Sequence, residues 1–472
     1  MPPSAAYRPD PRFASLGAEF ADAVRPAAFP SQILRFRNQR AAGEVGLETL
    51  TEAEWLAHFA AFQPLPDNQR TPLAMRYHGH QFRVYNPDLG DGRGFLFAQV
   101  RDRRGRLLDL ATKGSGQTPW SRDGDGRLTL KGGVREVLAA AMLEALGVPT
   151  SRAFSLVETG EALTRGDEPS PTRSAVLTRL SWSHIRFGTF QRHAAQERPD
   201  LVAELLNHVI QTYYPDLTGA NDPAAALLGA TARRSAQLTA AWMAAGFVHG
   251  VLNTDNMNIT GESFDYGPYR FLPRNDPNFV AAYFDHSGLY SFGRQPEAVL
   301  WNLTQLAGVL TTVTETEPLV AALNGFGPAY REALAAAMVR RLGLKPSGGD
   351  ADVELANAAF RALAEGGAPL RWEPFFFDWF CGREERALAG PRAPHYDGEA
   401  FRAFRALLAA RESDRPERLS AAWFARGEPE ELLYDEIEAI WAAIADQDDW
   451  APFDTKLAAI EAARSAWGFD PV

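Results

Sequence analysis

The spacing of apolar residues changes along the chain. Between about residues 77 and 130, short apolar runs such as FLFAQV and LLDLATKG alternate with clusters of Gly and Asp, which predicts strands joined by turns. A helix is expected at 135–146, and another strand at about 174–181. Beyond about residue 198, apolar residues recur at helical spacing over long segments. The pattern therefore predicts a β-rich part followed by a larger helical part.

The second half of the chain carries most of the predicted helices. Asp200 is expected to cap the first of them, and Pro296 to occupy the first turn of a later one. The segment LKPSGGDAD, residues 344–352, predicts a flexible joint because Gly and Pro disfavour regular structure. Helices are expected at 52–62, 200–214, 224–246, 296–313, 329–342, 352–364, 399–411, 430–446 and 453–467.

This order of elements predicts an α+β fold of the protein-kinase-like type, with a small β-rich N-lobe and a larger, mainly helical C-lobe. The 472 residues exceed what one compact core usually holds, which also favours two lobes. We expect an N-terminal extension packing on the lobes at 1–70, the N-lobe at 71–180, the C-lobe with the catalytic and metal loop at 181–343, and a divergent helical region at 344–472.

Composition narrows the choice of partners. The chain has 48 Lys and Arg against 59 Asp and Glu, a net charge of −11, which argues against nucleic acid or an anionic membrane as partner. No apolar run approaches the roughly 20 residues of a membrane span. A single cysteine, Cys381, excludes an intrachain disulfide, and the N-terminus lacks the apolar core of a signal peptide. We expect a cytoplasmic protein.

The run LGDGRGFLF, residues 89–97, is a candidate phosphate cradle. Gly90 and Gly92 would let backbone N–H groups approach anionic oxygens closely, and Arg93 adds positive charge. The alternative is an ordinary hairpin turn between two strands. Asp91 would be unfavourable beside a bound polyanion unless its side chain faces away.

A lysine and a glutamate could position phosphates beneath this run. Lys113 follows the apolar run LLDLAT, and Glu136 lies on the next predicted helix, which is the pairing that kinase folds use. Ordinary surface charges are the alternative. Several cations between and around them predict a local positive patch suited to a polyphosphate, or a solvated basic turn. They are Arg122, Arg127, Lys131 and Arg135.

The segment HGVLNTDNMNITGESFDYGP, residues 249–268, carries the most specific chemistry. Asn256 and Asp265 are oxygen ligands that suit Mg²⁺, and Asp255 could orient or deprotonate an attacking hydroxyl. Asx turns are the alternative for the first part of the segment. In ordinary kinases the metal-binding Asn follows the catalytic Asp by five positions, whereas here the two are adjacent.

Two more pairs of side chains are candidates for binding. Arg179 and Arg186 could face a common ligand, since guanidinium groups suit phosphate oxygens, although salt bridges would also explain them. His78 and His80 lack a third metal ligand nearby, which favours a structural role.

Taken together, these segments resemble the selenoprotein O family, kinase-like proteins that transfer AMP rather than phosphate to protein hydroxyls. They occur in family order over about residues 73–305, roughly half the chain. The matching segments are YHGHQF, LGDGRG, TKGSGQTPWSRDGDGR, REVLAAAMLEALGVPTSRA, RLSWSHIRFGTF, HGVLNTDNMNITGESFDYGP and GRQPEAVLWNL.

The resemblance implies an enzyme that binds ATP in a flipped orientation and AMPylates Ser, Thr or Tyr hydroxyls of proteins, releasing pyrophosphate. Asp255 would be the general base, Asn256 and Asp265 would bind Mg²⁺, or Mn²⁺ in its place, and Glu136 would hold Lys113. The nucleotide would contact Gly90, Gly92, Arg93, Lys113, Asp125, Gly126, Arg179, Arg186 and Asp265.

Two other functions remain open from the sequence. A conventional kinase would transfer the γ-phosphate, and a catalytically silent scaffold would only bind nucleotide. The adjacency of Asp255 and Asn256 counts against the kinase. The intact Lys113, Glu136 and Asp265 count against the scaffold.

Overall fold

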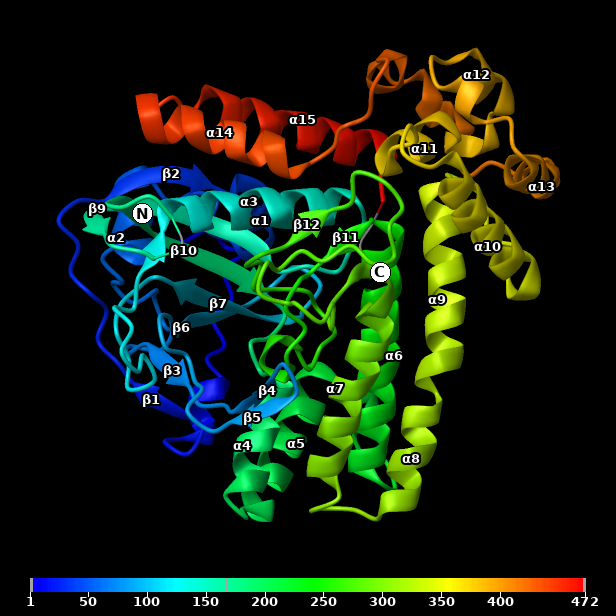
Figure 1. Ribbon diagram of the computed structural model, residues 1–472. Helices are drawn as coiled ribbons and strands as arrows, with labels where there is room; N and C mark the ends of the chain where they lie inside the picture. Colours follow the sequence, from blue (N-terminus) through cyan, green and yellow to red (C-terminus); the bar gives the residue numbers. More distant parts are fainter. Residues whose placement is uncertain (1–2, 167, 470–472) are drawn as a thin grey trace.

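An antiparallel sheet of eight strands forms the first part of the molecule in this computed structural model, which describes residues 3–166 and 168–469 (Figure 1). The fold is of mixed α/β type. Strand order is β1–β3–β6–β7–β10–β9–β2, and β8 pairs with β10 beside this path. The strands are β1 Ala21–Ala23, β2 Ile33–Arg37, β3 Leu73–Met75, β6 Leu96–Arg101, β7 Leu107–Lys113, β8 Leu128–Thr129, β9 Arg152–Leu163 and β10 Thr172–Ser181.

The first 70 residues, expected as an extension, supply β1 and β2 to this sheet. β1 pairs with β3, and β2 pairs with β9 at the opposite end of the strand order. Two helices of this region, α1 Gln39–Val45 and α2 Glu52–Phe59, pack against β9. The helix predicted at 52–62 is α2, and it ends at Phe59, three residues earlier than expected.

The predicted apolar runs form the centre of the sheet. Every residue of β7 is buried, and so are the first five residues of β6. Two short strands outside the sheet, β4 Gly79–Gln81 and β5 Val84–Asn86, pair with each other as a separate hairpin. Because β5 and β6 belong to different sheets, the Gly run that connects them is not a hairpin turn, and that alternative is wrong.

Helix α3, Leu130–Ala145, packs on β9 and β10 and is covered in turn by α14, Tyr434–Gln447, and α15, Ala451–Trp467 (Figure 1). The end of the chain therefore lies against the helix that carries Glu136. Apolar side chains and a charged rim enclose a cavity of about 310 Å³ between α1, α3, β9 and α15.

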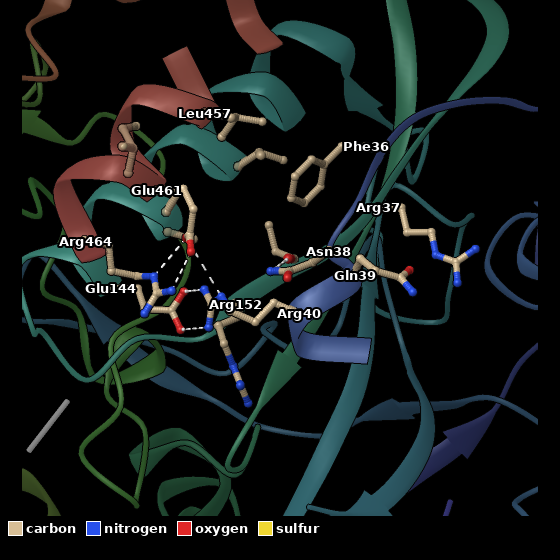
Figure 2. A pocket seen from close by; sticks show the side chains of 15 residues that line it. Phe36, Arg37, Asn38, Gln39, Arg40, Glu144, Arg152, Leu457, Glu461 and Arg464 are labelled. Carbon is tan, nitrogen blue, oxygen red and sulfur yellow. Dashed lines mark hydrogen bonds and ion pairs between the residues drawn. The ribbon is translucent and has the colours of Figure 1, made fainter. Parts of the chain in front are cut away.

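Ion pairs at the charged rim of this cavity connect α15 with α1, and α1 with α3 (Figure 2). Arg40 Nη1 donates to Glu144 Oε1 at 3.0 Å and Arg40 Nε lies 3.9 Å from Glu461 Oε2. Arg464 Nε donates to the same Glu461 carboxylate at 2.8 Å. These contacts join three segments that are distant in sequence, so the C-terminal helices help to fix the position of α3.

The helical part begins after β10 and is centred on α6, which packs against α7, α8 and α9. Pro296 lies in the first turn of α7, as predicted. Helix α5 begins at Pro199 with Arg198 at its N-cap, so Asp200 lies inside the first turn and the prediction that it caps the helix is wrong. The helices are α4 Phe187–Ala195, α5 Pro199–Tyr213, α6 Pro223–Ala244, α7 Gln295–Leu310, α8 Thr316–Asn324 and α9 Phe326–Arg341.

The remaining helices are α10 Gly349–Gly366, α11 Trp372–Asp378, α12 Glu384–Ala389 and α13 Glu399–Leu408. The joint expected at 344–352 is shorter than predicted. Leu344 bridges to Ser413 in antiparallel fashion, and α10 already begins at Gly349. Within the described residues, every helix is too short or too polar to cross a lipid bilayer.

Candidate active site

One cavity of about 700 Å³ gathers almost all the residues that the sequence predicts for the site. Of that set, only Glu136 and Asn256 are absent from its walls. Glu136 lies behind Lys113, and Asn256 uses its Nδ2 to donate to the Val251 carbonyl at 3.0 Å. The walls contain the predicted residues Gly90, Gly92, Arg93, Lys113, Asp125, Gly126, Arg179, Arg186, Asp255 and Asp265.

Lys113 occupies the last position of β7 and is buried, with 6% of its surface exposed. Its ammonium group pairs with Glu136 of α3 and lies 2.9 Å from Asp265 Oδ1. A strand and a helix therefore hold the lysine from two sides. This is the predicted Lys113–Glu136 pair, and it is not a pair of surface charges.

Asp265 is the meeting point of three cations. Arg179 Nη1 lies 3.0 Å from its Oδ1, Arg186 Nη1 lies 3.4 Å from its Oδ2, and Lys113 completes the set. Burial alone would raise the pKa of Asp265, but the three cations hold that pKa well below its usual range. With φ at 68°, the residue also adopts the left-handed conformation, which is unusual for a residue other than glycine.

The two arginines reach Asp265 from different elements. Arg179 lies on β10, and Arg186 precedes the first turn of α4. Both are about 5% exposed. Arg186 Nη1 also donates to the Asp255 carbonyl at 2.6 Å. The two arginines therefore meet at Asp265 from a strand and a helix start, which are the salt bridges expected as the alternative, and their binding of a common ligand stays a prediction.

Asp255 lies in a short 3₁₀ helix, Thr254–Asn256, which follows β11 Phe247–Val248; β11 pairs with β12, Arg270–Phe271. The residue is 8% exposed, and its Oδ1 makes no hydrogen bond to any part of the chain that the structure describes. Burial raises the pKa of Asp255 to about 6, although Arg186 opposes the rise. A desolvated carboxylate with a free oxygen is equipped to accept a proton.

The glycines of the cradle are required by close packing. A Cβ at Gly90 would lie 2.4 Å from the Trp120 ring, and one at Gly94 would lie 2.0 Å from the Thr112 carbonyl oxygen. At Gly92 the obstacle would be the Trp120 carbonyl oxygen, at 2.7 Å. A larger residue at Gly90 or Gly92 would displace the segment around Trp120, and one at Gly94 would displace β7 at Thr112.

The side chain of Asp91 does not face away from the cavity. It lines the cavity wall, where its Oδ2 accepts the Met75 N–H at 3.1 Å and its Oδ1 lies 3.6 Å from Arg186. Its alternation with glycines gave no sign of this orientation. Trp120 was also missed, since its position depends on a long-range bond from its Nε1 to Asp22 at 2.8 Å.

The basic patch predicted around residues 122–135 divides in the structure. Arg122 and Arg127 line the cavity, but Arg127 is already paired with Glu161 at 2.8 Å. Lys131 instead pairs with Glu438 of α14 at 2.7 Å, and Arg135 lies 3.9 Å from that glutamate. The patch is therefore split between the cavity and the contact with the C-terminal helices.

His78 and His80 have structural contacts. His78 Nδ1 bonds to the Tyr85 hydroxyl at 2.6 Å, and His80 Nδ1 accepts from Gln191 at 2.8 Å. Residues 3–166 and 168–469 contain no group of three or more His, Cys, Asp or Glu side chains arranged to hold a metal ion.

Around one cavity, the site combines the buried Lys113–Glu136 pair, two buried arginines and several carboxylates that include Asp255 and Asp265. This set defines an enzyme that acts on a phosphate-bearing substrate. A family model described as protein adenylyltransferase SelO matches residues 4–461. The chain belongs to this family of protein adenylyltransferases, which transfer AMP to proteins, as its motifs indicated.

Curated relatives cover nearly all of the chain. A protein of Synechococcus elongatus named protein nucleotidyltransferase YdiU is 46% identical to this chain, and the match covers 95% of this chain and 94% of the relative. A protein of the same name from Synechocystis sp. is also 46% identical, and that match covers 94% of this chain and 96% of the relative. A protein of that name from Gloeobacter violaceus is 48% identical over 94% and 93%.

Glu262, three residues before Asp265, gives the fold a dependence on pH. The partly buried carboxylate accepts the Trp182 N–H at 2.7 Å. Burial raises its pKa to about 7, against the effects of that hydrogen bond and of Arg152. Because the unfolded chain releases this proton at a lower pH than the fold does, the free energy of unfolding should fall as pH rises from about 4.5 to 7.

Replacement of this carboxyl group should remove that loss. We expect Glu262→Gln to be about 1–2 kcal/mol more stable than the parent at pH 8 and equal to it at pH 4, a discounted value because solvent still reaches the side chain. Urea unfolding at both pH values measures the difference. Glu354→Gln, on the exposed face of α10, is the control and should show no pH-dependent change. A variant less stable than the parent at pH 8 would contradict the argument.

Proposed function

We propose that the chain transfers AMP from ATP to Ser, Thr or Tyr hydroxyls of proteins with the nucleotide bound in the flipped orientation, on a kinase-like two-lobe scaffold. The convergence of Lys113, Arg179 and Arg186 on Asp265 carries the proposal. These three cations are buried and line one cavity, and guanidinium and ammonium groups suit the oxygens of the distal phosphates. With those phosphates held inward, the α-phosphorus faces the acceptor.

The chemistry follows from this orientation. Asp255 accepts the proton of the acceptor hydroxyl, and that oxygen attacks the α-phosphorus. The bond from the α-phosphorus to the bridging oxygen breaks, and pyrophosphate leaves with the electron pair. Lys113, Arg179 and Arg186 then stabilise the charge that develops on the leaving group. Glu136 acts by positioning Lys113.

The proposal includes a divalent cation held by Asp265 in the cavity wall and by Asn256, which lies outside that wall. The Asn256 amide is fixed through its Nδ2, so its oxygen is the free donor, and Asp265 supplies carboxylate oxygens from the cavity wall. Such hard oxygen donors, together with substrate phosphates, are what Mg²⁺ prefers. When bound, Mg²⁺ or Mn²⁺ would neutralise phosphate charge. The expected contacts of Gly90, Gly92, Arg93, Asp125 and Gly126 with the nucleotide belong to this proposal as well.

Labelled ATP tests the proposal directly. We expect the protein, incubated with Mg²⁺ and an acceptor-containing lysate, to transfer label from [α-³²P]ATP to protein and none from [γ-³²P]ATP. The reason is that the leaving group retains the β and γ phosphates. Transfer of the γ label would indicate a kinase, and ATP binding without transfer of either label would indicate a scaffold. Phosphodiesterase release of labelled AMP from the product identifies the adduct.

A further inference from the structure

The β4–β5 hairpin holds the loop that carries Asp255. The Thr254 hydroxyl oxygen accepts the His80 N–H at 2.7 Å, and Asn253 Oδ1 accepts the Phe82 N–H at 3.0 Å. These two loop residues directly precede Asp255. The turn of the hairpin is therefore fixed in position relative to the proposed base.

A second segment is anchored to the same loop. Gly250 adopts φ 85°, and a Cβ there would lie 3.1 Å from that of the buried Ala281. Asp285 accepts the Tyr290 N–H at 2.8 Å, and the Tyr290 hydroxyl donates to Asn253 Oδ1 at 2.8 Å. The turn at residues 283–284 is thus held at both ends by buried contacts.

This anchored turn exposes two aromatic side chains. Tyr283 is 78% exposed and Phe284 is 42% exposed. Their rings lie 5.1 Å apart, and the Phe284 ring lies 5.9 Å from that of Phe82 on the hairpin. We call Phe82, Tyr283 and Phe284 the aromatic patch. Exposed aromatic residues held rigidly together are characteristic of binding surfaces.

The location of the aromatic patch indicates its occupant. Gln81 lines the cavity together with Asp255, and the next residue, Phe82, begins the patch. One residue of extended chain spans about 3.5 Å, so residues within a few positions of a hydroxyl that reaches Asp255 can extend past Gln81 onto the patch. Arg83, which follows Phe82 in sequence, pairs with Glu297 at 3.0 Å, so the charge directly beside the patch is neutralised.

We propose that the aromatic patch docks an apolar side chain of the acceptor polypeptide, within a few residues of the hydroxyl that is modified. This inference rests on the proposed function and adds a preference for the sequence around the acceptor residue. The aromatic patch would contact an apolar side chain of the acceptor, whereas the cavity that binds the nucleotide recognises the charge of the phosphates. Tyr283 and Phe284 then determine specificity without touching the reacting atoms.

Peptide acceptors provide the test. A set of synthetic peptides, each with a central Ser and one Leu or Phe placed at successive positions on either side in an otherwise Ala and Gly background, is incubated with the full chain, Mg²⁺ and [α-³²P]ATP. We expect one position to raise kcat/KM about tenfold or more over the Ala peptide, which corresponds to about 1.4 kcal/mol of binding. In the double variant Tyr283→Ser, Phe284→Ser this preference should fall below about threefold, with transfer to the Ala peptide unchanged within about twofold.

The experiment also needs a matched control variant, and its negative outcomes distinguish failure of the docking site from failure of the proposed function. Val320→Ser removes an apolar residue of similar exposure, 49%, from α8 and should retain the full preference. Equal labelling of all peptides, self-labelling without any peptide labelling, or a preference that survives the double variant would overturn the docking site and leave AMP transfer intact. A double variant that instead changes the sedimentation mass would show that a second copy covers the patch, and would also overturn it. Absence of any α-label transfer would count against the proposed function itself.

Discussion

Asp265→Asn is expected to lower AMP transfer by about 100-fold or more, a loss of about 2.7 kcal/mol in transition-state stabilisation, without weakening the binding of metal-free ATP. The substitution removes a carboxylate ligand of the proposed metal site. It also removes the negative charge shared by Lys113, Arg179 and Arg186, which lie 2.9–3.4 Å from its oxygens. The three cations then attract phosphate more strongly, so affinity for ATP in EDTA should be equal or higher.

The same substitution should destabilise the protein when no nucleotide is bound. Removing one partner from a partly buried charge cluster leaves cations uncompensated, at a cost of about 3 kcal/mol. ATP in EDTA should recover much of this loss, because its phosphates replace the missing carboxylate. Thermal unfolding with and without ATP, together with isothermal titration of ATP in EDTA, measures both effects.

Asp352→Asn is the matched control for Asp265→Asn. Asp352 is also buried and ion-paired, with Arg411, but it lies in α10 at a distance in sequence from the site. We expect that variant to lose stability, to keep its AMP transfer, and to gain nothing extra from ATP. If Asp265→Asn bound metal-free ATP more weakly than the parent, the placement of the distal phosphates would be wrong.

The parts of the site that could be predicted are those that local sequence determines. An apolar run long enough for a buried strand positions Lys113 at its end, and the helical pattern that follows places Glu136 on α3. Arg179 could be placed on a strand for the same reason. The motif order then identified the family, because the combination of segments is far more specific than any one of them.

Features that depend on contacts distant in sequence could not be predicted. The pairing of β1 and β2 with the main sheet joins residues more than 40 positions apart, and short strands carry little periodicity. Asp91 turns into the cavity because the Met75 N–H and Arg186 stabilise it there. Lys131 does not contribute to the predicted basic patch, because its ammonium group pairs with Glu438, which is 307 positions away in sequence.

The difference between Asp91 and Asp255 leads to the last prediction. Both carboxylates line the cavity, and burial raises the pKa of each. The oxygens of Asp91 face the Met75 N–H and Arg186, whereas Asp255 Oδ1 has no hydrogen-bond partner among the described residues. Of these two carboxylates, Asp255 is therefore the one with a buried oxygen that no hydrogen bond in the described residues satisfies.

We expect Asp255→Asn to reduce kcat for AMP transfer by about 10²–10⁴-fold, the usual contribution of a general base, with the KM for ATP changed by less than about threefold. The amide keeps the shape of the side chain and cannot accept the proton. Asp91→Asn, in the same cavity, should retain transfer within about tenfold, since its carboxylate positions Arg186 and does not meet the acceptor. Steady-state transfer of [α-³²P]AMP to one protein acceptor compares the two. The assignment of the base would be reversed if Asp91→Asn lost the larger factor, because Asp255 would then be the carboxylate that only supports the site.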